Sequence, residues 1–247
     1  MDLREVIGDD CPIVTINHMT PFHDKYDSPY VVDYIKKMTK GTFMITNSYE
    51  AAKQWGWGHP VIHGMEVDEW WDLPKEPRCI IVLSPKGMES AYRRVFPHEV
   101  QRILAETKIK ITWVGIDKSF NSFDSYREFL GRSLVFFMPT WQSPMPRART
   151  EAFLSGCCVV STPYQDADTF IEHGVNGFLT SKSAIKDPRV MDNPEVAAKL
   201  IKRLIIDEPE LALKVGQAGK KMARERFCFQ RFEDQWIKVL EKIGVGI

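Results

Sequence analysis

The feature that most constrains the fold is the alternation of short strand-like runs with stretches of helical periodicity along the 247 residues. The strand-like runs are rich in Val, Ile and Phe and do not alternate cleanly between apolar and polar residues, which is typical of strands covered on both faces. This order of elements predicts an α/β protein with a mainly parallel sheet. Strands are expected at 12–16, 42–46, 61–63, 79–83, 109–114, 134–138, 158–161 and 177–179.

Helices are expected between these strands, and capping residues mark several of their starts. Ser28-Pro29 predicts a helix over 28–38, Asn47-Ser48 starts a second helix, and Asn193-Pro194 predicts a third over 193–206. Residues 229–243 place apolar side chains at helical spacing, so this last helix is expected to dock an apolar face.

Composition and charge exclude several classes of protein. Apolar residues make up 44% of the chain, which supports a real core and argues against disorder. The 33 basic residues balance the 33 acidic ones, so no excess positive charge points to nucleic acid or an anionic membrane. No apolar run approaches the roughly eighteen residues of a membrane span, and the first residues lack a signal-peptide pattern. Five cysteines without CxxC spacing predict reduced, mostly buried thiols in a cytoplasmic protein.

One segment has the composition of an interdomain linker. Residues 64–78 hold two prolines and five carboxylates and contain no long apolar run. We therefore expect a partial N-terminal α/β domain over 1–70 and a larger α/β domain over 71–228. The closing helix, 229–247, is expected to pack back toward the N-terminal domain.

The most informative stretch for function is 134–179. A buried strand leads into a loop rich in proline and arginine, and a short helix is then expected from Thr150 to the glycine at 156. Ligands of open α/β sheets gather at the carboxyl ends of the strands, and a helix N-terminus there favours an anion. Arg147 and Arg149 add positive charge suited to a diphosphate, while Glu151 suits the vicinal diol of a ribose. Residue types alone favour the simpler interpretation, in which the two arginines are solvated and Glu151 only complements the helix dipole.

Three separated pieces of this stretch carry a resemblance to a known family. Glu151-Ala-Phe-Leu-Ser-Gly-Cys-Cys-Val-Val-Ser-Thr, followed by Phe170-Ile-Glu-His-Gly-Val-Asn-Gly-Phe-Leu, resembles the nucleotide-sugar half of retaining GT-B glycosyltransferases, family four in particular. The resemblance extends more loosely over most of the chain. It implies a GT-B-like α/β fold, with a Rossmann-type parallel-sheet donor domain and a short, incomplete N-terminal domain. It also implies a hexosyltransferase that uses a UDP-sugar or GDP-sugar, retains configuration and needs no metal or other cofactor.

The resemblance also implies roles for individual residues. Glu151 matches the glutamate that holds the nucleotide ribose, and Lys86 matches a lysine that neutralises the departing diphosphate. Arg147 and Thr150 fall where main-chain amides meet the phosphates. His18 resembles a histidine that faces the transferred sugar.

The loop before the short helix departs from the family pattern. Eight residues before Glu151 stands Ser143, where the family has the first glutamate of its Glu-x7-Glu motif. Pro144-Met145-Pro146 replaces a glycine-rich loop, and proline has no N–H to donate. By position, Ser143 and Met145 are the donor-binding candidates of this loop.

Two further departures concern neighbouring segments. No arginine precedes Lys86 in the usual place, so Arg93 or Arg94 is the alternative. Only eleven residues separate Val114 from Tyr126, too few for the extra β–α unit that the family has there.

The sequence leaves alternatives open. It begins about halfway through a standard N-terminal domain, which a compact variant, a homodimer or partner chain that completes the domain, or a lost activity each explain. An enzyme would use a glycan, a lipid-linked sugar or a small molecule as acceptor. The alternative is a non-catalytic nucleotide-sugar-binding protein or subunit, and a third reading is an unrelated α/β domain. Asp166 and Asp168 have the spacing of a GT-A metal site, but we interpret them as two solvated aspartates.

Overall fold

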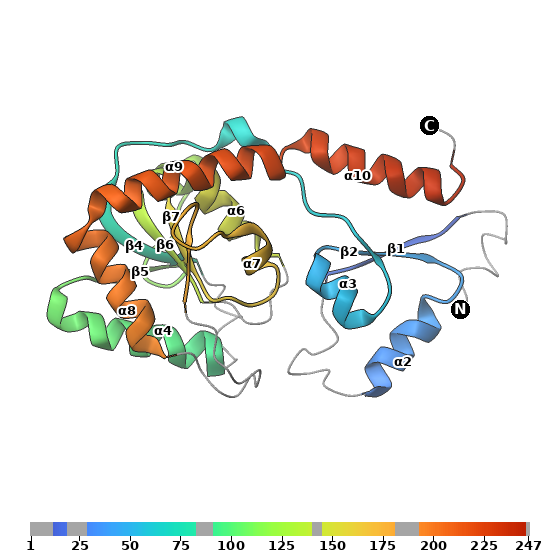
Figure 1. Cartoon of the computed structure of the whole chain (residues 1–247), viewed down its shortest axis with the longest axis horizontal. Helices are drawn as coiled ribbons and strands as arrows, with labels where there is room; N and C mark the ends of the chain where they lie inside the picture. The colour runs from blue at the N-terminus through green and yellow to red at the C-terminus, as the bar shows by residue number, and fades with distance from the viewer. Residues whose placement is uncertain (1–11, 19–28, 83–90, 140–144, 181–192, 246–247) are drawn as a thin grey trace. The chain divides into compact units, whose positions relative to one another are not determined.

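The structure is a computed structural model that describes residues 12–18, 29–82, 91–139, 145–180 and 193–245. By its contacts the chain divides into two compact units (Figure 1). Unit 1 joins Met1–Gly64 to Phe229–Ile247, and unit 2 is Met65–Cys228. The expected domain limits at residues 70 and 228 stay a prediction, because a division by contacts does not test which segments fold independently.

Unit 1 is built on a parallel sheet of β1 (Val14–Asn17), β2 (Phe43–Thr46) and β3 (His59–Pro60), in that order. Its helices are α2 (Pro29–Met38), α3 (Tyr49–Trp55) and α10 (Phe229–Lys242). The expected start of α3 is confirmed, since Ser48 Oγ accepts a hydrogen bond from the Ala51 N–H at 2.8 Å.

The alternation of side chains along β2 gives this sheet two covered faces. Met44 packs with Ala51 and Trp55 of the α3 segment, whereas its neighbour Ile45 packs with Val61 and Val239. Because successive strand residues point to opposite faces, α3 and α10 must lie on opposite sides of the sheet. The C-terminal helix thus completes the core of unit 1.

The strand expected at 61–63 is wrong, because the strand pairing ends at Pro60, three residues before the expected end. The Val61 N–H still donates to the Thr46 carbonyl at 2.9 Å. Ile62, however, turns its backbone to the Gln235 side chain of α10, which accepts from its N–H at 2.8 Å and donates to its carbonyl at 3.3 Å. A side-chain amide therefore takes the place of the next strand pair.

Unit 2 contains a five-stranded parallel sheet in the order β5-β4-β6-β7-β8. The strands are β4 (Glu76–Val82), β5 (Ile111–Val114), β6 (Ser133–Met138), β7 (Cys158–Ser161) and β8 (Phe178–Leu179). The helices are α4 (Ala91–Leu104), α5 (Phe123–Gly131), α6 (Arg147–Leu154), α7 (Ala167–Phe170), α8 (Pro194–Lys202) and α9 (Pro209–Arg226), with a π-helical turn over Arg203–Asp207. Figure 1 shows α4 and α8 on one side of this sheet and α6 and α9 on the other.

The central strands explain why the sequence shows apolar runs without alternation. Every residue of β6 and of β7 is buried, because helices cover both faces of the sheet. The bounds expected for the strand at 158–161 agree with β7.

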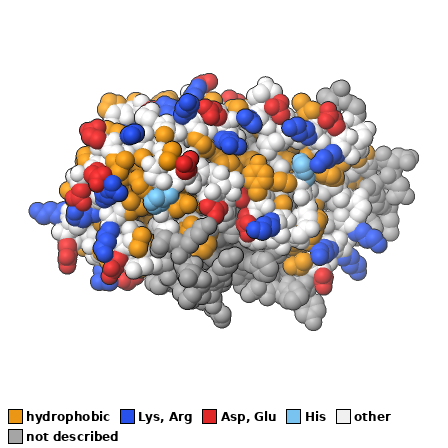
Figure 2. Space-filling view, in the orientation of Figure 1, with side chains coloured by type: hydrophobic (Ala, Val, Ile, Leu, Met, Phe, Trp, Pro, Cys, Tyr) orange, Lys and Arg blue, Asp and Glu red, His pale blue; other side chains and the backbone are white. Residues whose placement is uncertain are grey.

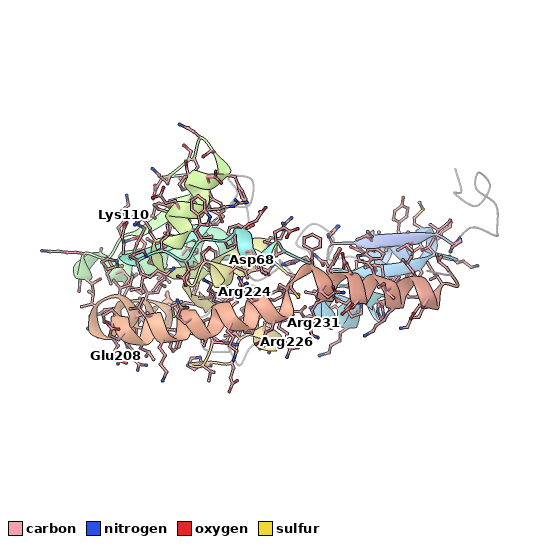
Figure 3. The ribbon with its side chains drawn as sticks, turned by 90° about the horizontal axis from the view of Figure 1, so that it is seen from above. Asp68, Lys110, Glu208, Arg224, Arg226 and Arg231 are labelled. Atoms are coloured by element: carbon pink, nitrogen blue, oxygen red, sulfur yellow. The ribbon has the colours of Figure 1, made fainter. Side chains whose placement is uncertain are left out.

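The expected linker at 64–78 is too long at its C-terminal end. β4 already begins at Glu76, and Pro77 lies where the register shifts between Glu76 and Cys79, a place where a proline removes no regular ladder bond. The earlier part is held on unit 2, since the Arg224 side chain donates to Asp68 Oδ1 at 2.5 Å (Figure 3) and to the Val67 carbonyl at 3.2 Å.

Within the described residues, no helix combines the length and apolarity needed to cross a membrane. On the face drawn in Figure 2, basic and acidic side chains are interspersed rather than gathered into one large patch of a single sign. The expectation of free thiols is confirmed for the four described cysteines, of which three are buried: Cys79, Cys157, Cys158 and Cys228. Cys11 lies outside the described residues.

Two glycines let α9 approach the backbone that follows α6. A Cβ at Gly216 would fall inside contact distance of the Gly156 carbonyl oxygen and 3.2 Å from the Cys157 carbonyl carbon. At Gly219 a Cβ would lie 2.7 Å from the Asn176 carbonyl oxygen and 2.8 Å from the Phe153 ring. Both contacts hold the C-terminal end of α6 and therefore fix where its N-terminal end lies.

We expect Gly216→Ala to lower the free energy of unfolding by about 1–3 kcal/mol, because the added methyl overpacks a backbone contact that has no flexible side chain to move aside. Urea-induced unfolding measures this. Lys214→Ala, at an exposed position of the same helix, is the matched control and should change stability little. A Gly216→Ala protein as stable as the wild type would contradict the close approach of α9.

Candidate functional site

The topology of unit 2 changes direction between the adjacent strands β4 and β6. From β4 the chain runs through α4 to β5 on one side, and from β6 it runs through α6 to β7 on the other. Right-handed crossovers in opposite directions place α4 and α6 on opposite faces of the sheet. The carboxyl ends of these two adjacent strands are thus a topological switch point, where open α/β sheets bind ligands.

α6 brings most of the expected donor-binding residues to this edge. Met145 precedes the helix, Arg147 is its first residue, and Arg149, Thr150 and Glu151 follow within five positions. Lys86 and Ser143 lie outside the described residues. Arg93 and Arg94 lie in α4, but their side chains are outside the described part of the structure.

The start of α6 differs from the expected start at Thr150. The Arg149 N–H already donates to the Pro146 carbonyl at 3.1 Å, so the first turn closes three residues earlier. Pro146 precedes the helix with φ −69°, the value that its ring imposes. As a result Arg147 and Arg149 belong to the first turn, and the exposed side chain of Arg147 adds its charge to the positive end of the helix.

Glu151 is half-buried and is held by a partner that the sequence analysis did not identify. The Tyr126 hydroxyl donates to Glu151 Oε2 at 2.7 Å. Burial raises the pKa of Glu151 above its ordinary value, while the bond from Tyr126 and the charge of Arg147 act in the opposite direction. These two groups therefore offset only part of the effect of burial on the pKa of Glu151.

Tyr126 occupies the first turn of α5 and lies among aromatic rings. Its ring centroid is 5.6 Å from Phe120, 5.9 Å from Phe123 and 6.3 Å from Trp70. Burial and the charge of Glu151 raise the pKa of Tyr126, so its hydroxyl stays protonated and donates. Sequence reasoning missed Tyr126 because 25 residues separate it from Glu151, and only the pairing of the sheet brings their helices together.

Arg149 is an interior charge, with only 1% of its surface exposed. Its Nη2 donates to the Met145 sulfur at 3.3 Å, whereas Nη1 is buried and has no hydrogen-bond partner among the described residues. Burial lowers the pKa of Arg149 to about 10, and the charges of Asp166 and Asp168 oppose this. The guanidinium thus remains charged at neutral pH inside the unit.

The interpretation of Asp166 and Asp168 as two solvated aspartates is wrong for Asp166. Asp166 is 1% exposed, whereas Asp168 lies at the surface. The buried Arg149 supplies the opposite charge that permits a buried carboxylate. Among the described residues, no group of three or more His, Cys, Asp or Glu side chains is arranged to hold a metal ion.

The turn after α7, which carries the last piece of the sequence motif, is a compact structure packed on β7. Asn176 accepts from the Glu172 N–H at 2.8 Å and donates to the Phe170 carbonyl at 3.1 Å. A Cβ at Gly177 would lie 3.2 Å from the Val159 carbonyl oxygen. Asparagine and glycine are therefore needed here for the shape of the turn.

His18 belongs to unit 1, where it directly follows β1 with an exposed side chain. It lies at the carboxyl end of its parallel strand, as a ligand-facing residue of an α/β unit does. Its expected role toward the transferred sugar stays a prediction.

Comparison with known proteins identifies this arrangement. Residues 93–207 match the family described as glycosyl transferases group 1. This range begins within α4 and includes β5, α5, β6, α6, β7 and the buried Arg149. This segment is therefore similar to a glycosyltransferase domain. A search of curated protein sequences found no significant match.

The fold of the whole chain is similar to solved glycosyltransferase structures of the GT-B class. Anabaena Alr3699/HepE in complex with UDP-glucose matches at a TM-score of 0.72 and 16% identity, over 98% of this chain and 77% of that one. TarM matches at 0.73 and 14% identity, over 94% and 51%. Sucrose-phosphate synthase from Thermosynechococcus elongatus matches at 0.66 and 14% identity, over 93% and 67%.

These findings confirm the expected resemblance to GT-B glycosyltransferases, the α/β fold and the glycosyltransferase class of enzyme. Assignment to family four remains a prediction. The roles of the individual residues in this segment also remain predictions, because the comparisons place no ligand in this chain.

The raised pKa of Glu151 makes a prediction about stability. An ionised carboxylate with a raised folded-state pKa destabilises the fold at pH values above that pKa, and this cost disappears below the ordinary pKa of 4.5, where both states are protonated. Glu151→Gln should therefore raise the free energy of unfolding at pH 7–8, and the gain should vanish near pH 4. Denaturant unfolding at several pH values measures this. Glu106→Gln, an exposed change, should show no such pH-dependent gain. A Glu151→Gln protein that is less stable at pH 8 contradicts the argument.

Proposed function

We propose that this protein transfers a sugar from a uridine-diphosphate sugar to an acceptor. The observation that carries the proposal is the position of Glu151, a half-buried carboxylate in the second turn of α6 at the topological switch point of a glycosyltransferase domain. A carboxylate there suits a ribose diol, and the helix N-terminus beside it suits the diphosphate.

The proposed donor is a UDP-sugar rather than a GDP-sugar. The structurally similar protein Alr3699/HepE was solved with UDP-glucose and with UDP, which supports uridine as the base and a hexose as the sugar. In this chain the diphosphate would lie near Arg147 and Thr150 at the start of α6. Lys86, which follows β4 in the sequence, would supply a further positive charge. Ser143 and Met145 would border the donor from the loop before α6, while Arg149 supplies a fixed interior charge.

The proposed chemistry depends on stabilising the departing diphosphate. Negative charge develops on the leaving phosphate oxygen, and a helix N-terminus, Arg147 and Lys86 would stabilise that charge without reorganisation of water. Cationic side chains then take the part that a metal plays elsewhere, so we propose a reaction that needs no metal and retains configuration. His18 would face the transferred sugar, and the acceptor would be a glycan, a lipid-linked sugar or a small molecule.

The setting of the reaction is also a proposal. The described cysteines are all free thiols, including the adjacent Cys157 and Cys158, which fits a reducing compartment such as the cytoplasm. A structural neighbour, the GtfA/B complex, contains two kinds of subunit. We propose that the protein associates with a second copy of itself or with a partner chain.

We expect UDP to stabilise the wild type in a thermal unfolding assay, whereas GDP, ADP and TDP should not. A nucleotide at a hundred times its dissociation constant adds about 2.7 kcal/mol to stability. Glu151→Ala should abolish the effect of UDP, since it removes the ribose acceptor, and Glu106→Ala should leave it intact. If none of the four nucleotides stabilises the wild type, the donor pocket does not exist.

We expect the wild type to release UDP from UDP-glucose, even without acceptor, at a rate that EDTA leaves unchanged. His18→Ala should lower this rate at least tenfold without changing the dissociation constant of UDP, because His18 is proposed to contact the sugar and not the nucleotide. A coupled assay for UDP measures the rate, and proton NMR of the released glucose reports the anomer. Loss of turnover in EDTA, restored by a divalent cation, would contradict metal-free chemistry.

A second candidate is a non-catalytic nucleotide-sugar-binding subunit. Ser143 favours it, because a serine stands where the family motif has its first glutamate. The two candidates differ in the turnover assay: a subunit without activity binds UDP through Glu151 yet releases no UDP from UDP-glucose.

A further inference from the structure

The bond between Tyr126 and Glu151 joins two helices on the same face of the sheet. Tyr126 comes from the first turn of α5 and donates to Oε2 of Glu151 on α6 at 2.7 Å. No described residue donates a hydrogen bond to Oε1 of Glu151. Among the residues that the structure describes, Tyr126 thus holds one carboxylate oxygen and the other has no hydrogen-bond donor.

We propose that Tyr126 is a positioning residue for the ribose-binding carboxylate, and that the pair of Tyr126 and Glu151 selects ribonucleotide donors over deoxyribonucleotide donors. The inference rests on the proposed function, since it assigns to this pair the recognition of the donor ribose. It adds a residue from α5 to a site otherwise formed by α6 and the loops at the carboxyl ends of the strands.

The tyrosine is fixed well enough to position its partner. Aromatic rings surround its own, with Phe120 and Phe123 at centroid distances of 5.6 and 5.9 Å. At the opposite ends of the same two helices, the buried ammonium group of Lys75 donates to the carbonyl of Gly131 at 2.6 Å and to that of Ser155 at 2.5 Å. The C-terminal ends of α5 and α6 are thereby linked, and their relative position is set at both ends.

The charge states of the pair suit this role. A vicinal diol donates two hydrogen bonds, so the acceptor must be an ionised carboxylate. The bond from Tyr126 and the charge of Arg147 favour ionisation of Glu151 and oppose the effect of its burial on the pKa. Tyr126 itself stays neutral, because burial and the nearby Glu151 raise its pKa. It therefore donates throughout the working range of pH.

The decisive experiment compares two ligands that differ only in the diol: UDP and 2′,3′-dideoxyuridine 5′-diphosphate. Calorimetry would give both dissociation constants for the wild type, Tyr126→Phe, Glu151→Gln and the control Tyr34→Phe, which alters an exposed tyrosine of unit 1. Tyr126→Phe should raise the dissociation constant of UDP about tenfold, because one charge-assisted hydrogen bond is lost. It should leave the dissociation constant of the dideoxy ligand unchanged. When Glu151 is already replaced by Gln, Tyr126→Phe should raise the dissociation constant of UDP little further.

The pH dependence gives a readout that a merely structural role does not move. UDP binding should fall as the pH drops through the pKa of Glu151 and the carboxylate becomes protonated. Tyr126→Phe removes a group that lowers this pKa, so the fall should begin at a higher pH than in the wild type. Glu151→Gln supplies the reference curve, because UDP itself gains a proton near pH 6.

The outcomes separate this inference from the proposed function. Equal weakening of both ligands by Tyr126→Phe would show only a structural role and overturn the inference, as would unchanged binding of UDP. In either case a loss of UDP binding in Glu151→Gln would leave the proposed function standing. A wild type that binds neither ligand would overturn both.

Discussion

The opposite directions of the two connections that leave β4 and β6 are the constraint on which the rest of unit 2 depends. Right-handed crossovers send α4 to one face of the sheet and α6 to the other, so the carboxyl ends of the two central strands form a topological switch point. The same handedness places α5 and α6 on one face. The contact between Tyr126 and Glu151 is therefore a consequence of strand order, which neither helix determines by itself.

The positions of α5 and α6 are fixed by contacts at their C-terminal ends, far from the switch point. α9 approaches the end of α6 through Gly216, and Lys75 links the last turns of α5 and α6. Asp72 holds the ammonium of Lys75 at 3.2 Å and also accepts from Gln217 of α9 at 2.8 Å. A segment that reads in the sequence as a polar linker thus fixes three helices. Side chains in the first turns of α5 and α6 are positioned in part by these contacts, which fix the C-terminal ends of the two helices.

Local patterns allowed the strands and the motif-bearing helix to be predicted, whereas pairings between distant segments escaped sequence reasoning. β7 could be predicted because four buried apolar or small residues follow a glycine. The end of β3 depends on Gln235, which lies 173 residues from Ile62, and no local pattern marks it. The sequence predicts a solvated Asp166, because it does not show that Arg149 is buried and interacts with this carboxylate. Glu151 was found from its place in a motif, but its partner Tyr126 carries no motif.

The short connection between Val114 and Tyr126 links the edge of the sheet to the site. With no further β–α unit there, β5 is the edge strand, and its outward N–H groups need partners within the unit. The Ile111 N–H donates to the Gln101 side chain at 2.6 Å and the Trp113 N–H to Asp117 at 3.3 Å, so the edge is closed to an added strand. The chain then passes directly into α5, and Tyr126 lies in the first turn of this helix. The short connection therefore leads from the edge strand to the helix that carries the partner of Glu151.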